Sequence, residues 1–301
     1  MPSLALLGIA IPSYNRPDLL ARLLDSIDAS LPISVSDNGA FLDEAFHARY
    51  PQVRFITQQA VVTMWQNWNR AARAVEAEWI VLPGDDDLYN RGAFDTIEHA
   101  LRLHPTADIV FFGHDLIDEH DRVIETWQPE AAVLAAPNGF ERVRLGVPAR
   151  PPGIVVRKAV FDRLGGFCED FHGTASDNDF YQRVAMLGTS VFVPDVVCAY
   201  RVWTSAGTTL TIATRSWLDD IDLWTRRMQE FAARQGGCAY PPGLRDDVYM
   251  ANLRAGIHAL KKRAGGYAAA WRHVAAARYP LRAHPLSHLK LLVQLLLPVR
   301  P

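Results

Sequence analysis

The chain has 301 residues, of which 49% are hydrophobic, 21% charged and 10% aromatic, and this ordinary globular usage excludes a disordered, collagen-like or coiled-coil protein. Its three cysteines, Cys168, Cys198 and Cys238, are too few and too scattered for a disulfide framework or a Cys-x-x-Cys metal site. We therefore expect a packed core in a reducing compartment.

The formal net charge of −2 hides an uneven distribution. Residues 248–301 contain nine Lys and Arg and no Asp or Glu, so residues 1–247 hold 22 basic and 33 acidic side chains, a net charge of −11. Two regions with different roles are expected. No apolar run reaches the roughly 18 residues that cross a bilayer. The run Leu4–Ile11 predicts a buried strand rather than a signal peptide, because no basic residue precedes it and no small-residue cleavage site follows.

Short apolar runs alternate with amphipathic stretches in the first half, which is typical of a sheet with crossover helices. Pro17 and Asp18 suit the first turn of the first helix. The predicted strands are 5–11, 33–36, 53–57, 79–82 and 108–113, and the predicted helices are 18–29, 42–48, 65–75 and 93–103.

Residues 115–150 lose this regularity, because several prolines interrupt any long element. A second structured block follows, with strands 154–156, 190–193 and 197–202 and helices 158–164 and 179–187. From residue 216 onward the chain is predicted to be helical.

An acidic run, Gly84-Asp85-Asp86-Asp87, directly follows the predicted strand 79–82. Adjacent carboxylates repel one another, so the run favours a site where a cation or hydrogen-bond donors neutralise it. Oxygen ligands on a loop suit Mg²⁺ or Mn²⁺ bound together with a diphosphate. The alternative is a solvated acidic turn that caps the next helix.

Four motifs in order resemble those of family 2 inverting glycosyltransferases of the GT-A fold. They are Ile11-Pro12-Ser13-Tyr14-Asn15-Arg16-Pro17, Ser36-Asp37-Asn38-Gly39, Trp65-Gln66-Asn67-Trp68-Asn69-Arg70-Ala71 and Gly84-Asp85-Asp86-Asp87-Leu88. The resemblance extends over about residues 4–203. It implies an α/β fold with a mixed, mostly parallel sheet flanked by helices, here with a C-terminal helical appendage.

The resemblance also implies the donor site. Asp37 would accept the ring N–H of uracil, thymine or guanine, and its alternative role is that of a turn residue before Gly39. Pro12, Tyr14 and Asn69 would line the donor pocket. Asp86 and Asp87 would hold Mn²⁺ or Mg²⁺. Because Gly84 stands where the family often has a carboxylate, the ribose contact would be missing or made by Asp85.

A second constellation, Gly165-Gly166-Phe167-Cys168-Glu169-Asp170 followed by Ser176-Asp177-Asn178-Asp179 and Arg183, is similar to the family's acceptor half. It implies that Asp177 is the general base, because inverting transfer needs a carboxylate to take the acceptor's proton. Asp179 and Arg183 would support the site, and Ser176 replaces the usual Glu. The structural alternative is a helix N-cap.

Many relatives place a metal-binding His two residues after a Tyr-Arg pair, but here Trp203 follows Tyr200-Arg201-Val202. Water or diphosphate would then fill that position, the cation would be weakly held, or Arg201 would clamp phosphate. Trp127 and Trp203 are the candidate acceptor contacts. Trp65 and Trp68 lie three residues apart, so at least one of them is expected in the core.

The basic tail interleaves cationic and aromatic residues, an arrangement that suits anionic lipid or, alternatively, a helical cap on the catalytic domain. The net charge of the body disfavours nucleic acid as a partner. The tail's basic residues include Lys261, Lys262, Arg263, Arg272, Arg278, Arg282 and Lys290.

We therefore predict a catalytic domain over residues 1–212, divided into a nucleotide-sugar half (1–105) and an acceptor half (106–212), and a basic helical region over 213–301. The predicted activity is inverting transfer from a UDP, dTDP or GDP sugar to a glycan or lipid-linked acceptor in bacterial-type polysaccharide or glycolipid assembly. We expect the protein in the cytoplasm, at the inner membrane face if the tail binds lipid. The alternatives are a degenerate, non-catalytic binding subunit and a sugar nucleotidyltransferase, although the latter would require a Gly-rich phosphate loop that Pro12-Ser13-Tyr14-Asn15 does not provide.

Overall fold

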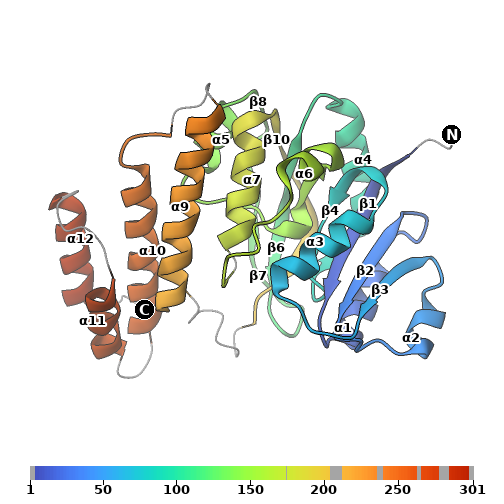
Figure 1. Ribbon diagram of the computed structural model, residues 1–301, viewed down its shortest axis with the longest axis horizontal. Coiled ribbons are helices and arrows are strands. Elements are labelled where there is room, and N and C mark those ends of the chain that lie inside the picture. Colours follow the sequence, from blue (N-terminus) through green and yellow to red (C-terminus); the bar gives the residue numbers. More distant parts are fainter. Residues whose placement is uncertain are drawn as a thin grey trace. The chain divides into compact units, whose positions relative to one another are not determined.

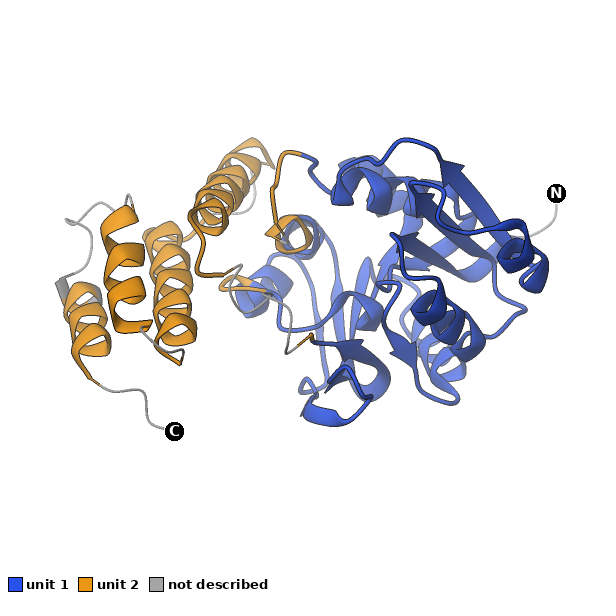
Figure 2. Cartoon of the chain, turned by 90° about the horizontal axis from the view of Figure 1, so that it is seen from below, with its two compact units in different colours: residues 1–143, 147–169, 180–202 blue, residues 144–146, 170–179, 203–301 orange. Residues whose placement is uncertain are grey.

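The computed structural model describes residues 4–173, 175–203, 212–235, 240–262, 266–277 and 285–297. The chain divides into two compact units (Figure 2). Unit 1 comprises residues 1–143, 147–169 and 180–202, and unit 2 comprises residues 144–146, 170–179 and 203–301. Residues 170–179, which include the predicted base, are therefore grouped with the C-terminal helices. The predicted catalytic boundary at residue 212 stays a prediction.

Unit 1 is built on a ten-stranded mixed sheet (Figure 1). Its first half has the order β3-β2-β1-β4, and all neighbouring strands there are parallel. These strands are β1 (Ala5–Ser13), β2 (Ile33–Asn38), β3 (Val53–Gln58) and β4 (Ala77–Val81). Since parallel strands end at the same edge, the motifs that follow β1, β2 and β4 come together there.

The sheet continues from β4 as β9-β6-β10-β5, with β7 paired to β6 and β8 paired to β10. β9 runs antiparallel to both β4 and β6, whereas β10 is parallel to β6. The strands are β5 (Leu88–Tyr89), β6 (Ile109–Ile117), β7 (Val123–Trp127), β8 (Ala132–Leu134), β9 (Ile154–Arg157) and β10 (Ser190–Arg201). The predicted α/β class with a mixed sheet flanked by helices is confirmed.

Local sequence signals mark the first turns of α1 and α3. Pro17 opens α1, with Asp18 in its first turn, and Thr63 and Gln66 form a capping box at the start of α3. The helices with residues in this unit are α1 (Pro17–Ser26), α2 (Glu44–Arg49), α3 (Met64–Ala74), α4 (Ala93–Leu103), α5 (Asn138–Val143), α6 (Lys158–Leu164) and α7 (Ala175–Leu187), and a short 3₁₀ turn spans Pro151–Gly153.

A continuous apolar core holds the sheet and its helices together. It is formed by side chains of β1 and β4, such as Leu7, Ile9 and Trp79, and of α1, such as Leu20 and Leu23, all at most 1% exposed. Burial of an aliphatic side chain of this size contributes about 1.5–3 kcal/mol. The site loops are thus attached to strands whose side chains form the buried core.

Three differences from the predicted elements have physical causes. Residues 115–150 form β7, β8 and α5, because pairing with β6 and β10 stabilises segments whose own sequence pattern is weak. The two predicted strands 190–193 and 197–202 are a single strand, β10, with register shifts after Val193 that accommodate Pro194 as a bulge. Helix α7 begins at Ala175, so that Asp177 lies inside its first turn, where the helix dipole favours acidic residues.

Unit 2 contains a bundle of helices in which α10 packs against α9, α11 and α12 (Figure 1). They are α9 (Arg215–Gln235), α10 (Leu244–Lys261), α11 (Gly266–Ala276) and α12 (Pro285–Leu296). None of the helices in the described ranges combines the length and apolarity that crossing a bilayer requires. Four of the basic tail residues, Arg263, Arg278, Arg282 and Arg300, lie outside the described residues.

Candidate active site

The acidic loop after β4, residues 84–87, is joined to the end of β1 through Asp85. We call this junction the corner. The Ser13 hydroxyl and the backbone N–H of Tyr14 both donate to Asp85 Oδ2, at 3.1 and 2.9 Å. Asp85 is 6% exposed, and burial raises its pKa to about 6 despite these hydrogen bonds. Burial therefore disfavours the charged form of this carboxylate.

Arg16, which lies just after β1, supplies cationic charge to the same corner. Its Nη1 lies 2.6 Å from Asp86 Oδ2 and 3.5 Å from Asp85 Oδ1. The Arg16 side chain is 44% exposed, so this is a solvent-facing interaction that a competing cation or anion can rearrange. Arg16 was not among the predicted site residues, although its place in the motif before Pro17 was the available signal.

Asp87 points into its own loop rather than outward. The backbone N–H of Gly84 donates to its Oδ2 at 2.7 Å, and the N–H of Arg201 donates to its Oδ1 at 3.2 Å. A Cβ at position 84 would come within 3.1 Å of the Asp86 carboxylate and 3.3 Å of that of Asp87, so glycine suits this tight turn. Burial and then the Asp86 charge raise the pKa of Asp87 well above its usual range.

Arg201, at the end of β10, holds the acidic loop after β4 in place. Its Nε donates to the backbone oxygen of Asp86 at 2.9 Å, its Nη1 donates to that of Asp118 at 2.7 Å, and its Nη2 forms an ion pair with Asp121 at 2.6 Å. The residue is 3% exposed. These contacts position the acidic loop, whereas a phosphate contact by Arg201 stays a prediction.

Two exposed aromatic rings stand where β1 and β2 end. The rings of Tyr14 and Phe41 meet edge to face with centroids 5.3 Å apart, and they are 51% and 41% exposed. Solvent-exposed aromatic faces are suited to stacking on a flat ring. Phe41 was missed by the sequence analysis, because a lone aromatic after a turn carries no distinctive pattern.

Asp37, near the end of β2, is fully buried. Its two carboxylate oxygens accept the backbone N–H groups of Phe41 and Leu42, at 3.0 and 3.1 Å. These hydrogen bonds fit the alternative role of Asp37 as a turn residue. Its hydrogen bond to a nucleotide base stays a prediction. Pro12 is buried within β1, opposite Ser36 of β2.

Asn69 of α3 grips the glycine-rich loop 165–169. Its Oδ1 accepts the N–H of Phe167 at 2.9 Å, and its Nδ2 donates to the Phe167 oxygen at 2.9 Å and to Glu169 Oε1 at 3.0 Å. Gly166 has φ +75°, and a Cβ there would lie 2.4 Å from Asn69 Oδ1. The close approach therefore requires glycine. Donor binding by Asn69 stays a prediction.

Arg183 of α7 holds the same loop from the other side. Its Nη1 and Nη2 donate to the backbone oxygens of Leu164 and Gly166, at 3.0 and 2.9 Å. Both side chains are almost fully buried, with Arg183 6% and Asn69 1% exposed. The loop is thus fixed by two side chains from distant parts of the chain.

In unit 2, the three polar residues that open α7 differ in exposure. Ser176 and Asp179 are fully buried, whereas Asp177 is half-buried. Asp179 forms an ion pair with Arg227 of α9, whose Nε lies 3.2 Å from Asp179 Oδ1. Asp177 Oδ1 accepts the N–H of Asn178 at 2.6 Å. Asp177 is therefore the more accessible carboxylate of the pair.

One of the two tryptophans that begin α3 lies in the core. Trp65 is 3% exposed and packs against Trp68 and Phe167, with ring centroids 5.6 and 5.1 Å away, so the expectation of a core tryptophan is confirmed. Trp127 ends β7, half-buried, and its ring lies 5.3 Å from that of His114. Trp203 lies two residues after the end of β10 and is half-buried. Their acceptor roles stay predictions.

The carboxylates of the corner fit a divalent cation in a limited way. Among the described residues, no group of three or more His, Cys, Asp or Glu is arranged to hold a metal by itself. Mg²⁺ and Mn²⁺ with a diphosphate need only one or two carboxylates, because phosphate and water complete the octahedron. Asp86 meets that need, and Asp85 offers Oδ1, which lies 3.5 Å from the exposed Arg16 side chain, whereas both oxygens of Asp87 accept backbone N–H groups.

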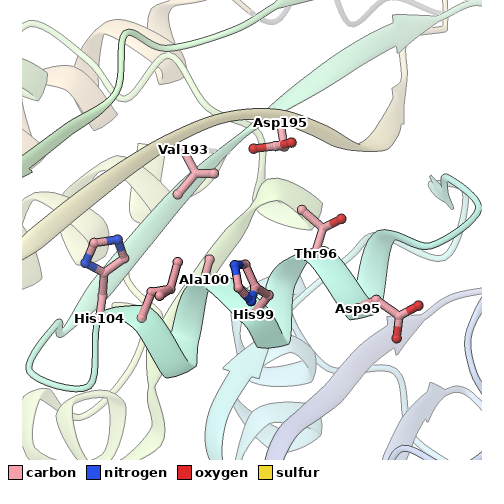
Figure 3. A pocket seen from close by; sticks show the side chains of 8 residues that line it. Asp95, Thr96, His99, Ala100, His104, Val193 and Asp195 are labelled. Atoms are coloured by element: carbon pink, nitrogen blue, oxygen red, sulfur yellow. The ribbon is translucent and has the colours of Figure 1, made fainter.

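A separate groove of unit 1 contains none of the predicted site residues (Figure 3). It lies between α4 and the bulge of β10, and Figure 3 shows His99 on the helix, His104 at its end and Asp195 on the strand. We assign it no role in the candidate site.

A comparison with family models identifies the protein family of this domain. Residues 8–143, which include β1, β2, α3 and the acidic loop, match the family model of glycosyl transferase family 2. The chain carries a family 2 glycosyltransferase domain. The predicted family and enzyme class are confirmed. A search of curated proteins found no match.

Solved structures extend the likeness in fold beyond that domain. The glycosyltransferase resembles residues 1–349 of S. aureus TarS in complex with UDP-GlcNAc, with a TM-score of 0.61 and 15% identity, covering 96% of this chain and 88% of that one. It also resembles the mannosyltransferase PcManGT from Pyrobaculum calidifontis in complex with GDP-Man and Mn²⁺, with a TM-score of 0.57 and 17% identity, covering 97% and 85%. At these identities the likeness establishes the GT-A fold.

Proposed function

We propose that this glycosyltransferase moves a sugar from a nucleoside-diphosphate donor to a hydroxyl acceptor with inversion at the anomeric carbon. The observation that carries the proposal is the corner where Asp85, Asp86 and Arg16 meet beside the exposed Tyr14 and Phe41 rings. A flat base, a diphosphate and a cation each have a chemically matched partner within it.

In the proposed reaction, the Asp177 carboxylate takes the proton of the acceptor hydroxyl. The acceptor oxygen forms its bond to the anomeric carbon as the bond from that carbon to the diphosphate oxygen breaks, and the electron pair leaves with the nucleoside diphosphate. Asp179, neutralised by Arg227, orients the start of α7 that carries Asp177. Positioned general-base catalysis of this kind contributes about 10²–10⁴ in rate.

Asp86 is the metal ligand we propose, with Asp85 beside it. A bound Mn²⁺ or Mg²⁺ supplies positive charge that stabilises the departing diphosphate. Arg16, whose Nη1 lies 2.6 Å from Asp86 and whose side chain is 44% exposed, would add positive charge for the diphosphate.

The donor we propose is a UDP, dTDP or GDP sugar. Support comes from the TarS complex, which contains UDP-GlcNAc, and from PcManGT, which contains GDP-Man and Mn²⁺. The acceptor we propose is a glycan or a lipid-linked glycan in polysaccharide or glycolipid assembly, at the cytoplasmic face of a membrane.

The first experiment compares the melting temperature of the protein with UDP, dTDP and GDP, each with and without Mn²⁺. Binding to the folded state raises the melting temperature according to ligand concentration over Kd, so one nucleotide should stand out and depend on Mn²⁺. No stabilisation by any of the three would overturn the proposed donor site.

The second experiment tests the base with Asp177→Asn in a transfer and donor-hydrolysis assay. The variant should lose about 10²–10⁴ in kcat while the nucleotide still raises its melting temperature. Asp162→Asn on α6, whose side chain is 50% exposed, is the matched control and should retain full activity. Nucleotide binding without any turnover in the parent protein would instead indicate the non-catalytic binding subunit.

A further inference from the structure

Helix α12 is apolar on two faces, and only one of them is covered. Leu291 and Leu295, four residues apart, are 6% and 2% exposed and pack inward. The other face remains open to solvent and carries Leu286, Leu289, Leu292, Val293 and Leu296, which are 73%, 57%, 46%, 43% and 70% exposed. A helix face of this size that is apolar and exposed usually contacts another molecule. We therefore ask what the open face of α12 binds.

The open face is held in place by contacts to α10. The Lys261 Nζ donates to the backbone oxygens of Gln294 at 2.6 Å, Leu295 at 3.3 Å and Leu297. Arg254 Nε donates to Gln294 Oε1 at 3.0 Å, and Gln294 Nε2 donates to the Arg254 oxygen at 2.9 Å. A lysine at a helix C-terminus satisfies its last carbonyls and its dipole, so the rotation of α12 is fixed.

An exposed tyrosine lies beside the same helix end, and an exposed tryptophan follows it on α11. Lys261 Nζ sits 4.4 Å from the centre of the Tyr267 ring, which places this residue of α11 next to the C-terminus of α12. Tyr267 is 44% exposed, and Trp271, one turn further along α11, is 46% exposed. Tyrosine and tryptophan, with an apolar body and a polar tip, are enriched at the boundary between lipid and water.

The charge around this face indicates which partner it fits. Residues 248–301 contain nine basic and no acidic side chains, and the described Lys262, Arg272 and Lys290 are exposed. A second copy would bring another such cationic region against the first, and like charges oppose that contact. An anionic bilayer complements both the cations and the leucines.

We propose that the open face of α12, together with Tyr267 and Trp271, docks on the surface of an anionic membrane, with the leucines entering the headgroup boundary. This surface lies in unit 2 and uses none of the residues assigned to donor binding or proton transfer. Its test therefore needs no nucleotide sugar and is independent of the proposed reaction.

The experiment is flotation of the full chain with vesicles of phosphatidylcholine and phosphatidylglycerol at a ratio of about 3:1, and with phosphatidylcholine alone, at low salt. The parent protein should float with the anionic vesicles and bind the neutral ones on the order of tenfold more weakly. Leu289→Gln with Leu296→Gln should lower binding to anionic vesicles roughly 10- to 100-fold, because two leucine side chains no longer enter the bilayer.

Leu103→Gln with Ile124→Gln is the matched control, because it removes two comparably exposed apolar side chains, 61% and 55%, from unit 1. It should bind vesicles like the parent, and circular dichroism should show both double variants folded. The proposal is overturned if the parent does not float with anionic vesicles or if the two double variants bind equally. It is also overturned if the parent self-associates without lipid and the α12 variant alone becomes monomeric, since the face then joins two copies.

Discussion

Replacing Asn69 distinguishes a structural clamp from a donor contact. The side chain is 1% exposed and satisfies both the N–H and the C=O of Phe167, each at 2.9 Å. Asn69→Ala leaves those two buried backbone groups without their partner, at about 1–3 kcal/mol each. We therefore expect a loss of roughly 2–5 kcal/mol in the free energy of unfolding.

The assay is thermal unfolding followed by circular dichroism, with and without the nucleotide that stabilises the parent. At about 2–4 °C per kcal/mol, the melting temperature of Asn69→Ala should fall by roughly 5–15 °C. Asn69→Asp keeps the acceptor for the Phe167 N–H but places a carboxylate against the Phe167 oxygen and Glu169, so it should lose at least as much.

The matched control is Arg73→Gln on the same helix. Arg73 reaches the same loop only through an exposed 3.5 Å hydrogen bond to the Gly165 oxygen, so its loss should change stability by less than about 0.5 kcal/mol. If Asn69→Ala melted within a degree of the parent but no longer bound nucleotide, the clamp would be refuted and Asn69 would be a donor contact.

Three further predictions concern His114, Arg201 and Asp86. Burial, and then Arg150, lower the pKa of His114 to about 4, so the folded state resists a proton that the unfolded chain accepts at about 6.5. The contribution of His114 to the free energy of unfolding should thus fall by up to about 3 kcal/mol as pH drops from 6.5 to 4, whereas the raised pKa of Asp85 acts in the opposite direction. Urea titrations of the parent and of His114→Gln across this range should isolate the His114 contribution as the difference between the two proteins. Arg201→Met should lower the melting temperature and nucleotide affinity together, and Arg201→Lys should not restore them, because one ammonium cannot reproduce a guanidinium bonded to three partners; retained stability in both variants would contradict this. Asp86→Asn should abolish the Mn²⁺ dependence of nucleotide stabilisation, measured as the shift in melting temperature, and an unchanged shift would remove Asp86 from the metal site.

Much of the fold followed from local pattern. The apolar run before Pro12, the helix-opening Pro17 and the alternation of strands and helices each predicted an element that the structure contains. Local spacing also located the acidic run at the end of a strand, since strand periodicity and its termination are read within a few residues. The family resemblance of the four motifs belongs to the same local information.

The hydrogen bonds between residues far apart in the chain could not be predicted from local sequence patterns. The sequence does not indicate that Asn69 binds a loop 98 residues away, nor that Asp87 turns inward while Asp86 faces Arg16. Equal aspartates in a row have equal local propensity, so only the loop's three-dimensional closure by Arg201 distinguishes them.

The residues alone determined the α/β class, the position of the acidic loop at a sheet edge and the cationic character of the C-terminal region. Only the tertiary structure decided which carboxylates are buried and which face of α12 stays open. The physical reason is that charge and periodicity are properties of neighbouring residues, whereas burial and hydrogen-bond pairing depend on which distant segments pack together.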